Sequence, residues 1–185
     1  TAMDGYDHVL LFSLRGDVIG YDGVATGHYA SAAVALEDSV VLAVPLTALD
    51  AVRHGDAVLD HALQVAISRQ LAHAVELAEL MSAVAADARL ARFLLHWSQR
   101  MADQGLSPRR LLLRMNRRDI AAHLGLAHET ISRCFSLLSE RGLVNVSNRD
   151  VEILDVEGLR RAAHSTRGAG EDHARQEPEG EARHD

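Results

Sequence analysis

The chain has 185 residues, enough to bury a core in one or two domains, and its formal net charge is −7. It holds a single cysteine, Cys134, which excludes an intrachain disulfide and a multi-cysteine metal site and fits a reducing cytoplasm. No apolar run is long enough to span a bilayer, so we expect no membrane partner.

Charge is distributed unevenly along the chain. Residues 86–143 carry ten Arg against five acidic side chains, a net charge of +5, whereas residues 1–85 have a net charge of −8 and residues 144–185 one of −4. All nineteen basic residues are Arg. If the chain binds DNA, the central segment is where the DNA would lie.

Residues 8–46 alternate short β-rich runs with glycine and aspartate turns. The runs are His8–Leu14, G-D-V-I-G-Y-D-G and Ser39–Leu46, a pattern that predicts antiparallel strands. The chain begins at Thr1 rather than at a Met, and the first run has too few neighbours to complete a barrel or sandwich. We therefore expect residues 1–56 to form part of a β-roll in a sequence truncated at its N-terminus.

A long helix is predicted from Ala57 to about Ala83. Its apolar residues recur in steps of four and three along one seam, as in a coiled coil: Leu63, Ile67, Leu71, Ala74, Ala78 and Met81. The seam could pack on the β region, but the length of the helix and its polar opposite face favour a dimer helix. We assign residues 57–85 to this dimerisation helix.

A second helix is predicted from Ala86 to about Asp103, with Leu90, Phe93, Leu94 and Trp97 on its apolar face. The segment G-L-S-P breaks it before a basic cluster, whose arginines could meet phosphates. The cluster comprises Arg109, Arg110, Arg114, Arg117 and Arg118.

Residues 115–138 read as two short helices joined at Gly125, with the spacing of a helix-turn-helix. In the second helix, Ile131, Phe135 and Leu138 share one side. Glu129, Ser132 and Arg133 share the other side, and these residue types can hydrogen-bond to base edges. The alternative is an ordinary amphipathic hairpin with a solvated polar face.

Beyond Gly142, L-V-N-V-S-N-R-D-V-E-I-L predicts a β-hairpin with a turn at Ser147–Asp150, which would be the wing of a winged helix-turn-helix. This domain is expected over residues 86–163. Residues 164–185 hold no Val, Ile, Leu, Phe, Trp or Tyr and are expected to be a disordered tail.

With β-roll, long helix and winged helix-turn-helix in this order, residues 1–163 resemble the superfamily of the cyclic-AMP receptor protein and the fumarate and nitrate reductase regulator. Of the two branches, that of the fumarate and nitrate reductase regulator (Fnr) is more similar to this chain than that of the cyclic-AMP receptor protein (Crp). The matching segments are G-D-V-I-G-Y-D-G, A-L-E-D-S, R-F-L-L, G-L-S-P-R, R-R-D-I-A-A-H-L-G-L and E-T-I-S-R. The resemblance implies an α+β fold with a cupin-like, cyclic-nucleotide-binding-like β-roll. It also implies a cytoplasmic, homodimeric transcription regulator, an activator in the family's usual role, with double-stranded DNA and RNA polymerase as partners.

The E-x-x-S-R residues of that branch read a TTGAT half-site, so the match makes Glu129, Ser132 and Arg133 the base readers. We expect DNA backbone contacts from Arg114, Arg117, Arg118 and Ser136. Ala127 departs from the family, which often has a Thr cap there, and an Ala in that place typically costs ~1 kcal/mol.

Two further departures concern cofactors. Tyr21 and Ala30-Ser31 stand where cyclic-nucleotide binders of the superfamily have a Glu and an Arg-Ser pair, so cyclic AMP is not expected to bind. Leu42 stands where the oxygen-sensing branch has a cluster cysteine, so a [4Fe-4S] cluster is not expected either.

Other functions have weaker support in the sequence. His128-Glu129 begins like a zinc-protease H-E-x-x-H motif but has Ser132 at the second ligand position, and we expect the histidines to lie at the surface and to hold no metal. Cys134 could be a redox switch, since Arg133 would lower its pKa, but a small semi-buried residue is the commoner case. The chain has no catalytic set that would make it an enzyme. The alternative to a regulator is a ligand-sensing β-roll whose helix-turn-helix serves protein contacts.

Overall fold

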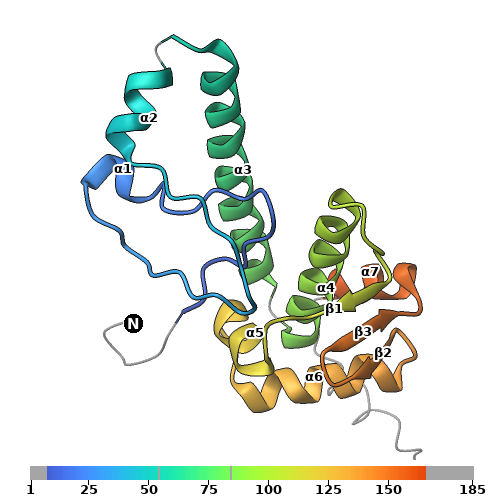
Figure 1. Cartoon of the computed structure of the whole chain (residues 1–185). Coiled ribbons are helices and arrows are strands. Elements are labelled where there is room, and N and C mark those ends of the chain that lie inside the picture. Colours follow the sequence, from blue (N-terminus) through green and yellow to red (C-terminus); the bar gives the residue numbers. More distant parts are fainter. Residues whose placement is uncertain (1–7, 54, 84, 166–185) are drawn as a thin grey trace, which may run out of the picture.

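The computed structural model describes residues 8–53, 55–83 and 85–165. Two parts are evident in Figure 1: the long helix α3 (Ala57–Ser82) with the N-terminal segments beside it, and a unit of helices and a small sheet near the lower end of α3. We call the second part, residues 86–165, the winged-helix unit. Mixed helices and an antiparallel sheet confirm the α+β class.

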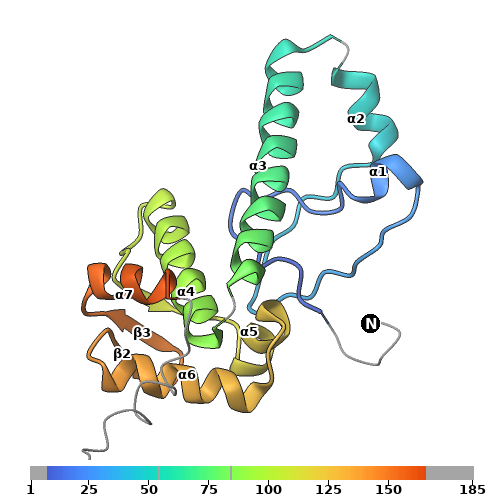
Figure 2. The ribbon, with the colours of Figure 1, turned by 180° about the vertical axis from the view of Figure 1, so that it is seen from behind.

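Helix α3 confirms the predicted long helix. Its start is fixed by Asp56, whose carboxylate accepts hydrogen bonds from the backbone N–H groups of Val58 and Leu59, at 2.9 and 3.1 Å. The helix ends at Ser82, where Ala83 adopts an extended conformation. Seen from behind, α3 lies in front of the N-terminal segments (Figure 2).

Helix α4 (Ala86–Asp103) is the centre of the winged-helix unit and confirms the second predicted helix. It packs against α6 (His128–Glu140) and α7 (Val156–Ala163). The side chains expected on its apolar face are all buried: Leu90, Phe93, Leu94 and Trp97. Their burial removes a large apolar area from water and joins the helices into one core.

The sheet has the strand order β1-β3-β2, and both strand pairs are antiparallel. Strands β2 (Val144–Ser147) and β3 (Asp150–Ile153) confirm the predicted hairpin, and Asn148 takes a φ of 55° in its turn. Strand β1 (Arg110–Leu112) and helix α7 were not predicted from the sequence.

The strands predicted between His8 and Leu46 are wrong for this structure. Residues 8–45 form turns, unpaired extended segments and the short helix α1 (Gly23–Thr26), and α2 (Leu46–Arg53) follows. A strand requires a hydrogen-bonded neighbour, and none of these runs lies in register with another within the described residues. Many apolar side chains beyond the first of these runs consequently face solvent: Val34 is 82% exposed, Val40 fully exposed and Leu42 87% exposed. The tail predicted to be disordered lies, apart from its first two residues, outside the described residues.

Candidate nucleic-acid interface

The first helix of the predicted helix-turn-helix is α5 (Arg117–Leu124). Its N-terminus forms a capping box: the Asn116 side chain accepts from the N–H groups of Arg118 and Asp119, and the Asp119 carboxylate accepts from the Asn116 N–H. These bonds satisfy orphan donors of the first turn and fix where the helix begins.

The turn between α5 and α6 is built on Gly125. Its φ of 62° and ψ of 40° lie in the left-handed region, as the sequence predicted. The Met81 side chain from the end of α3 approaches so closely that a Cβ at Gly125 would lie 2.7 Å from its Cε. The last turn of α3 therefore contacts the helix-turn-helix directly.

Helix α6 separates its two faces as the periodicity indicated. The buried side chains are Ile131, Cys134, Phe135 and Leu138. Glu129 and Arg133 are exposed, and Ser132 is half-buried, with its hydroxyl donating to the His128 carbonyl at 3.1 Å. The structure thus places the three predicted base readers together on the outer side of one helix.

The N-terminus of α6 has no side-chain cap. Ala127 occupies the N-cap position with extended backbone and cannot accept a hydrogen bond. The arrangement agrees with the departure noted in the sequence, and the first N–H groups of α6 remain without that side-chain partner.

The four predicted backbone contacts have different environments. Arg118 and Ser136 are exposed, and the Ser136 hydroxyl donates to the Ser132 carbonyl at 3.3 Å. Arg114 pairs with Glu37, with Nε and Oε2 2.9 Å apart. Arg117 instead turns inward and is half-buried.

The guanidinium carbon of Arg117 lies 3.3 Å from the centroid of the Phe135 ring. Its Nη2 donates to the carbonyl of Asn148 in the wing turn at 3.1 Å, and burial lowers the pKa of the guanidinium. Arg117 therefore joins α5, α6 and the wing, a role that the sequence did not indicate.

A hollow of about 400 Å³ opens between the N-terminus of α5 and the wing. Several of its lining residues were not assigned to a site from the sequence. Their positions next to the helix starts and the wing turn could have indicated them. The lining comprises Leu113, Met115, Asn116, Arg117, Arg118, His128, Asn148 and Arg149. Three guanidinium groups around one hollow suit an anion such as a phosphate.

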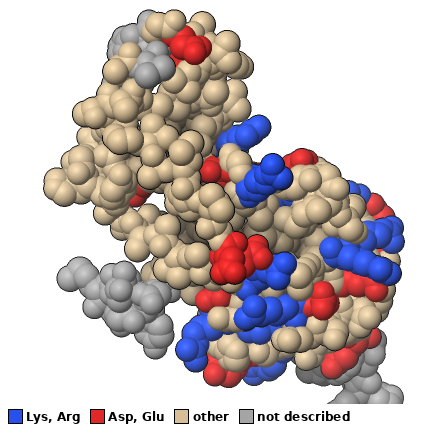
Figure 3. Space-filling model, in the orientation of Figure 1, with Lys and Arg blue, Asp and Glu red and all other residues tan. Residues whose placement is uncertain are grey.

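Figure 3 shows that charged side chains gather on the winged-helix unit, where Arg groups are interspersed with Asp and Glu. The N-terminal part seen in this view has few charged groups. This arrangement agrees with the charge asymmetry of the sequence and places the positive groups on the same unit as α6.

The predicted dimer seam lies along α3. Among its large side chains, Ile67 is 45%, Leu71 67% and Met81 39% exposed, and Val75 beside them is 52% exposed. Ala74 and Ala78 are also exposed, while Leu63 is half-buried. Met81 additionally contacts the turn at Gly125 within the same chain. Apolar side chains left exposed at this spacing suit a helix that packs against a second copy.

The histidines predicted to lie at the surface include three that do not. His73, His96 and His123 are half-buried where α3 and the N-terminal segment meet the winged-helix unit. Burial, assisted by the nearby positive charge of Arg100, lowers the pKa of His96 to about 4. No group of three or more potential ligand side chains within the described residues could hold a metal ion.

Cys134 is buried and its thiol is not activated. Burial raises its pKa to about 11, and the nearby carboxylate of Asp87 acts in the same direction. The opposing influence of Arg133 is smaller. A thiol with so high a pKa holds almost no reactive thiolate near neutral pH, which disfavours the redox switch.

No helix within the described residues is long and apolar enough to cross a membrane.

Residues 88–162 match the model of the Crp-like helix-turn-helix domain, which covers most of the winged-helix unit. The transcriptional regulatory protein btr of Bordetella pertussis is 37% identical over 149 residues, 80% of this chain and 62% of btr.

The fumarate and nitrate reduction regulatory protein of Escherichia coli K12 is 34% identical over 163 residues, 88% of this chain and 65% of that protein. These matches make the chain similar, over most of its length, to regulators of the Crp/Fnr superfamily. The structure of FixK2 from Bradyrhizobium japonicum aligns with a TM-score of 0.56 and 29% identity over 64% of this chain and 59% of that one. The chain spans less than two thirds of the length of these relatives.

Proposed function

We propose that the chain is a DNA-binding transcription regulator that binds, as a homodimer, a palindromic site with TTGAT-like half-sites. The observation that carries the proposal is the division of α6, which buries one face in the core and leaves Glu129 and Arg133 exposed beside Ser132. A helix held by its apolar face and exposed along a polar one can enter the major groove.

The chemistry of the exposed face supports sequence reading. Arg133 can donate two hydrogen bonds to O6 and N7 of a guanine, and Glu129 can accept from the N4 amine of a cytosine. Arg118 and Arg149 line the hollow beside the wing, where they would meet phosphates on either side of the groove. Positioning contacts and reading contacts would then come from the same winged-helix unit.

Dimerisation would occur along α3, where Ile67 and Leu71 are exposed. A two-fold axis along this helix would place two copies of α6 for two half-sites, about one helical turn of DNA apart. DNA binding also implies action in the cytoplasm, with RNA polymerase as the partner of the bound dimer.

We further propose that the described residues bind neither cyclic AMP nor a [4Fe-4S] cluster. The Asp22 carboxylate accepts hydrogen bonds from the Ala30 N–H at 3.1 Å and the Ser31 hydroxyl at 3.4 Å. The Ala30 N–H and the Ser31 hydroxyl, which a cyclic phosphate would need as hydrogen-bond donors, are therefore already bonded to an anionic side chain. For the cluster, Leu42 provides no thiolate and the Cys134 thiol is buried in the winged-helix unit.

The test is a titration of the protein against two labelled duplexes, one with inverted TTGAT half-sites and one with both half-sites scrambled. The expected result is tighter binding to the TTGAT duplex, with an affinity that falls linearly with the logarithm of salt concentration. Equal affinity for both duplexes would contradict sequence reading. Absence of binding to either duplex would favour the alternative in which the helix-turn-helix serves protein contacts.

The dimer has a separate test by sedimentation at micromolar concentration. Leu71→Asp should convert dimer to monomer, because it places a carboxylate in the apolar seam. Ala72→Asp adds the same charge at an exposed position on the side of α3 away from the seam and should remain dimeric. A wild-type protein that sediments only as monomer would refute the dimer.

A further inference from the structure

Residues 9–18, which we call the clasp segment, cross from the N-terminal region onto the winged-helix unit. Phe12 is inserted into the core and is only 7% exposed. Its ring meets Phe93 and Trp97 of α4 edge-on, with centroids 6.2 and 6.1 Å apart, and its centroid lies 5.0 Å from that of His123 in α5. One side chain of the clasp segment thus contacts two helices of the winged-helix unit.

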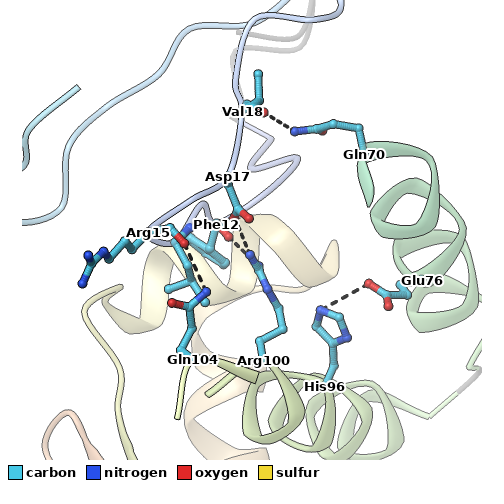
Figure 4. Close-up of polar contacts among 10 residues, drawn as sticks. Phe12, Arg15, Asp17, Val18, Gln70, Glu76, His96, Arg100 and Gln104 are labelled. Carbon is cyan, nitrogen blue, oxygen red and sulfur yellow. Dashed lines mark hydrogen bonds and ion pairs between the residues drawn. The ribbon is translucent and has the colours of Figure 1, made fainter. Parts of the chain in front are cut away.

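Arg100 of α4 holds the same segment by charge and hydrogen bonds (Figure 4). It is 9% exposed, and its guanidinium donates to the Phe12 carbonyl at 2.6 Å and to Oδ2 of Asp17 at 2.5 Å. The Asp17 carboxylate also accepts from the Leu14 N–H at 2.8 Å, which closes the turn around Gly16. A buried guanidinium is costly unless it is paired, so Arg100 and the folded turn require one another.

Three further hydrogen bonds hold the clasp segment, one each from the C-terminal end of α4, from α3 and from α5. Gln104 donates to the Arg15 carbonyl at 3.1 Å, and Gln70 of α3 donates to the Val18 carbonyl. Nδ1 of His123 lies 2.9 Å from the Val9 carbonyl and donates to it as the neutral tautomer, in keeping with a pKa that burial lowers. The clasp segment is therefore bonded to α3, α4 and α5 at once.

The junction that the clasp segment spans is short. Only residues 83–85 separate α3 from α4, and Ala83 and Ala85 both have extended backbone. Other contacts also cross the junction: Arg92 donates to the Glu79 carbonyl, Arg89 donates to the Ala83 carbonyl, and Nε2 of His96 lies 3.3 Å from Oε2 of Glu76 (Figure 4). The Met81 side chain also contacts the turn at Gly125. An extended linker of this length permits a hinge unless further contacts fix the angle.

We infer that residues 9–18 act as an intramolecular clasp, closed by Phe12 and Arg100, that fixes the angle between α3 and the winged-helix unit. The clasp does not involve the exposed face of α6, so it leaves reading of one half-site unchanged. Its effect arises only when both copies of α6 in a dimer must meet two half-sites at a set separation. This consequence rests on the proposed function, whereas the fixed angle can be measured without DNA.

The angle is tested with spin labels at Ala72 of α3 and Ser139 of α6, both exposed, after Cys134→Ala removes the native thiol. Labelled chains are diluted into unlabelled protein so that one labelled chain is observed per dimer. We expect a narrow distance distribution in the otherwise unchanged protein and a broad one in Phe12→Ala and in Arg100→Met. Arg160→Met makes the same change at an exposed arginine of α7 and should leave the distribution narrow. Distributions that stay narrow in both clasp variants, which circular dichroism shows to be folded, would overturn the inference.

The DNA measurement compares a duplex with two half-sites and a duplex with one. Opening the clasp should lower the affinity for the two-site duplex by about tenfold or more, because the effective concentration of the second α6 at its half-site falls. Affinity for the one-site duplex should stay within about twofold of the wild-type value. Equal losses on both duplexes would contradict a positioning role. If the wild-type protein binds neither duplex, the proposed function fails, and the spin-label distances still decide whether the clasp exists.

Discussion

Arg117 offers a sharp test of how the helix-turn-helix is held against the wing. Its guanidinium carbon lies 3.3 Å from the centroid of the Phe135 ring and its Nη2 donates to the Asn148 carbonyl. Arg117→Ala removes a partly desolvated cation–π contact, worth about 0.5–2 kcal/mol. It also removes a charged hydrogen bond, worth about 1.5–3 kcal/mol. Because the two contacts share one side chain, we expect the free energy of unfolding to fall by about 2–3 kcal/mol.

The assay is equilibrium unfolding in urea, followed by circular dichroism. With a slope of about 1–3 kcal/mol per molar urea for a small protein, the midpoint should fall by about 1–2 M. Arg117→Lys should recover only part of the loss, since an ammonium lacks the flat face that stacks on Phe135.

Arg118→Ala is the matched control, because Arg118 is exposed on the same turn of α5. It should change the free energy of unfolding by less than about 0.5 kcal/mol. It should instead reduce the salt dependence of DNA binding by about one unit, since one fewer counterion is released. If Arg117→Ala unfolds at the wild-type urea concentration, the proposed link between α5, α6 and the wing is wrong.

Three other predictions concern α6, α7 and the half-buried histidines. Gly158→Ala should destabilise the protein by more than about 1 kcal/mol in urea unfolding, because the new Cβ would lie 2.3 Å from Oδ2 of Asp155 and 2.6 Å from Leu143; an unchanged midpoint would contradict the packing of α7. Ala127→Thr should raise the free energy of unfolding by about 1 kcal/mol, because Thr can cap α6. A melting temperature that stays at the wild-type value would contradict this. The pKa of His96 is about 4 in the folded state, below its unfolded value of about 6.5. As the pH falls from about 6.5 to 4, the unfolded state therefore binds a proton that the folded state does not, and the protein loses stability over that range. The raised pKa of Glu76 opposes this loss, so the effect of His96 is isolated by comparing the wild type with His96→Gln. Between pH 7.5 and 5 the variant should lose about 2 kcal/mol less of its free energy of unfolding than the wild type. Parallel pH profiles of stability would refute the lowered pKa of His96.

Periodicity, caps and glycine turns predicted the parts of the fold that depend on local sequence. Helices α3 to α6 and the wing hairpin appear where the pattern placed them. Strand β1 was missed because three consecutive leucines show no alternation in the sequence, although Leu111 and Leu113 are buried and Leu112 between them is exposed. The short helix α7 was missed although Asp155 caps it, since eight residues give little periodicity.

The wrong strand predictions have a different origin. An alternating pattern indicates that a segment can form a strand, but the strand exists only when a partner completes the ladder. Between residues 8 and 45 no such partner is present among the described residues, and side chains such as Val40 remain exposed.

For the candidate site, helical spacing was enough to predict which residues of α6 face outward. It could not predict that Arg117 turns inward, because a guanidinium can equally meet a phosphate or stack on an aromatic ring. Nor could it predict the clasp, whose central hydrogen bond joins Arg100 to a residue 88 positions earlier in the chain.

The central claim is that the exposed face of α6 reads DNA sequence, and Arg133→Ala tests it most directly. The measurement is the affinity of wild-type and variant protein for the TTGAT duplex and for the scrambled duplex, each at two salt concentrations. We expect a loss of about 1–3 kcal/mol on the TTGAT duplex, little change on the scrambled one and an unchanged salt slope. If Arg133→Ala instead weakens binding to both duplexes by the same factor, the role of Arg133 is electrostatic and α6 does not read the sequence through this residue.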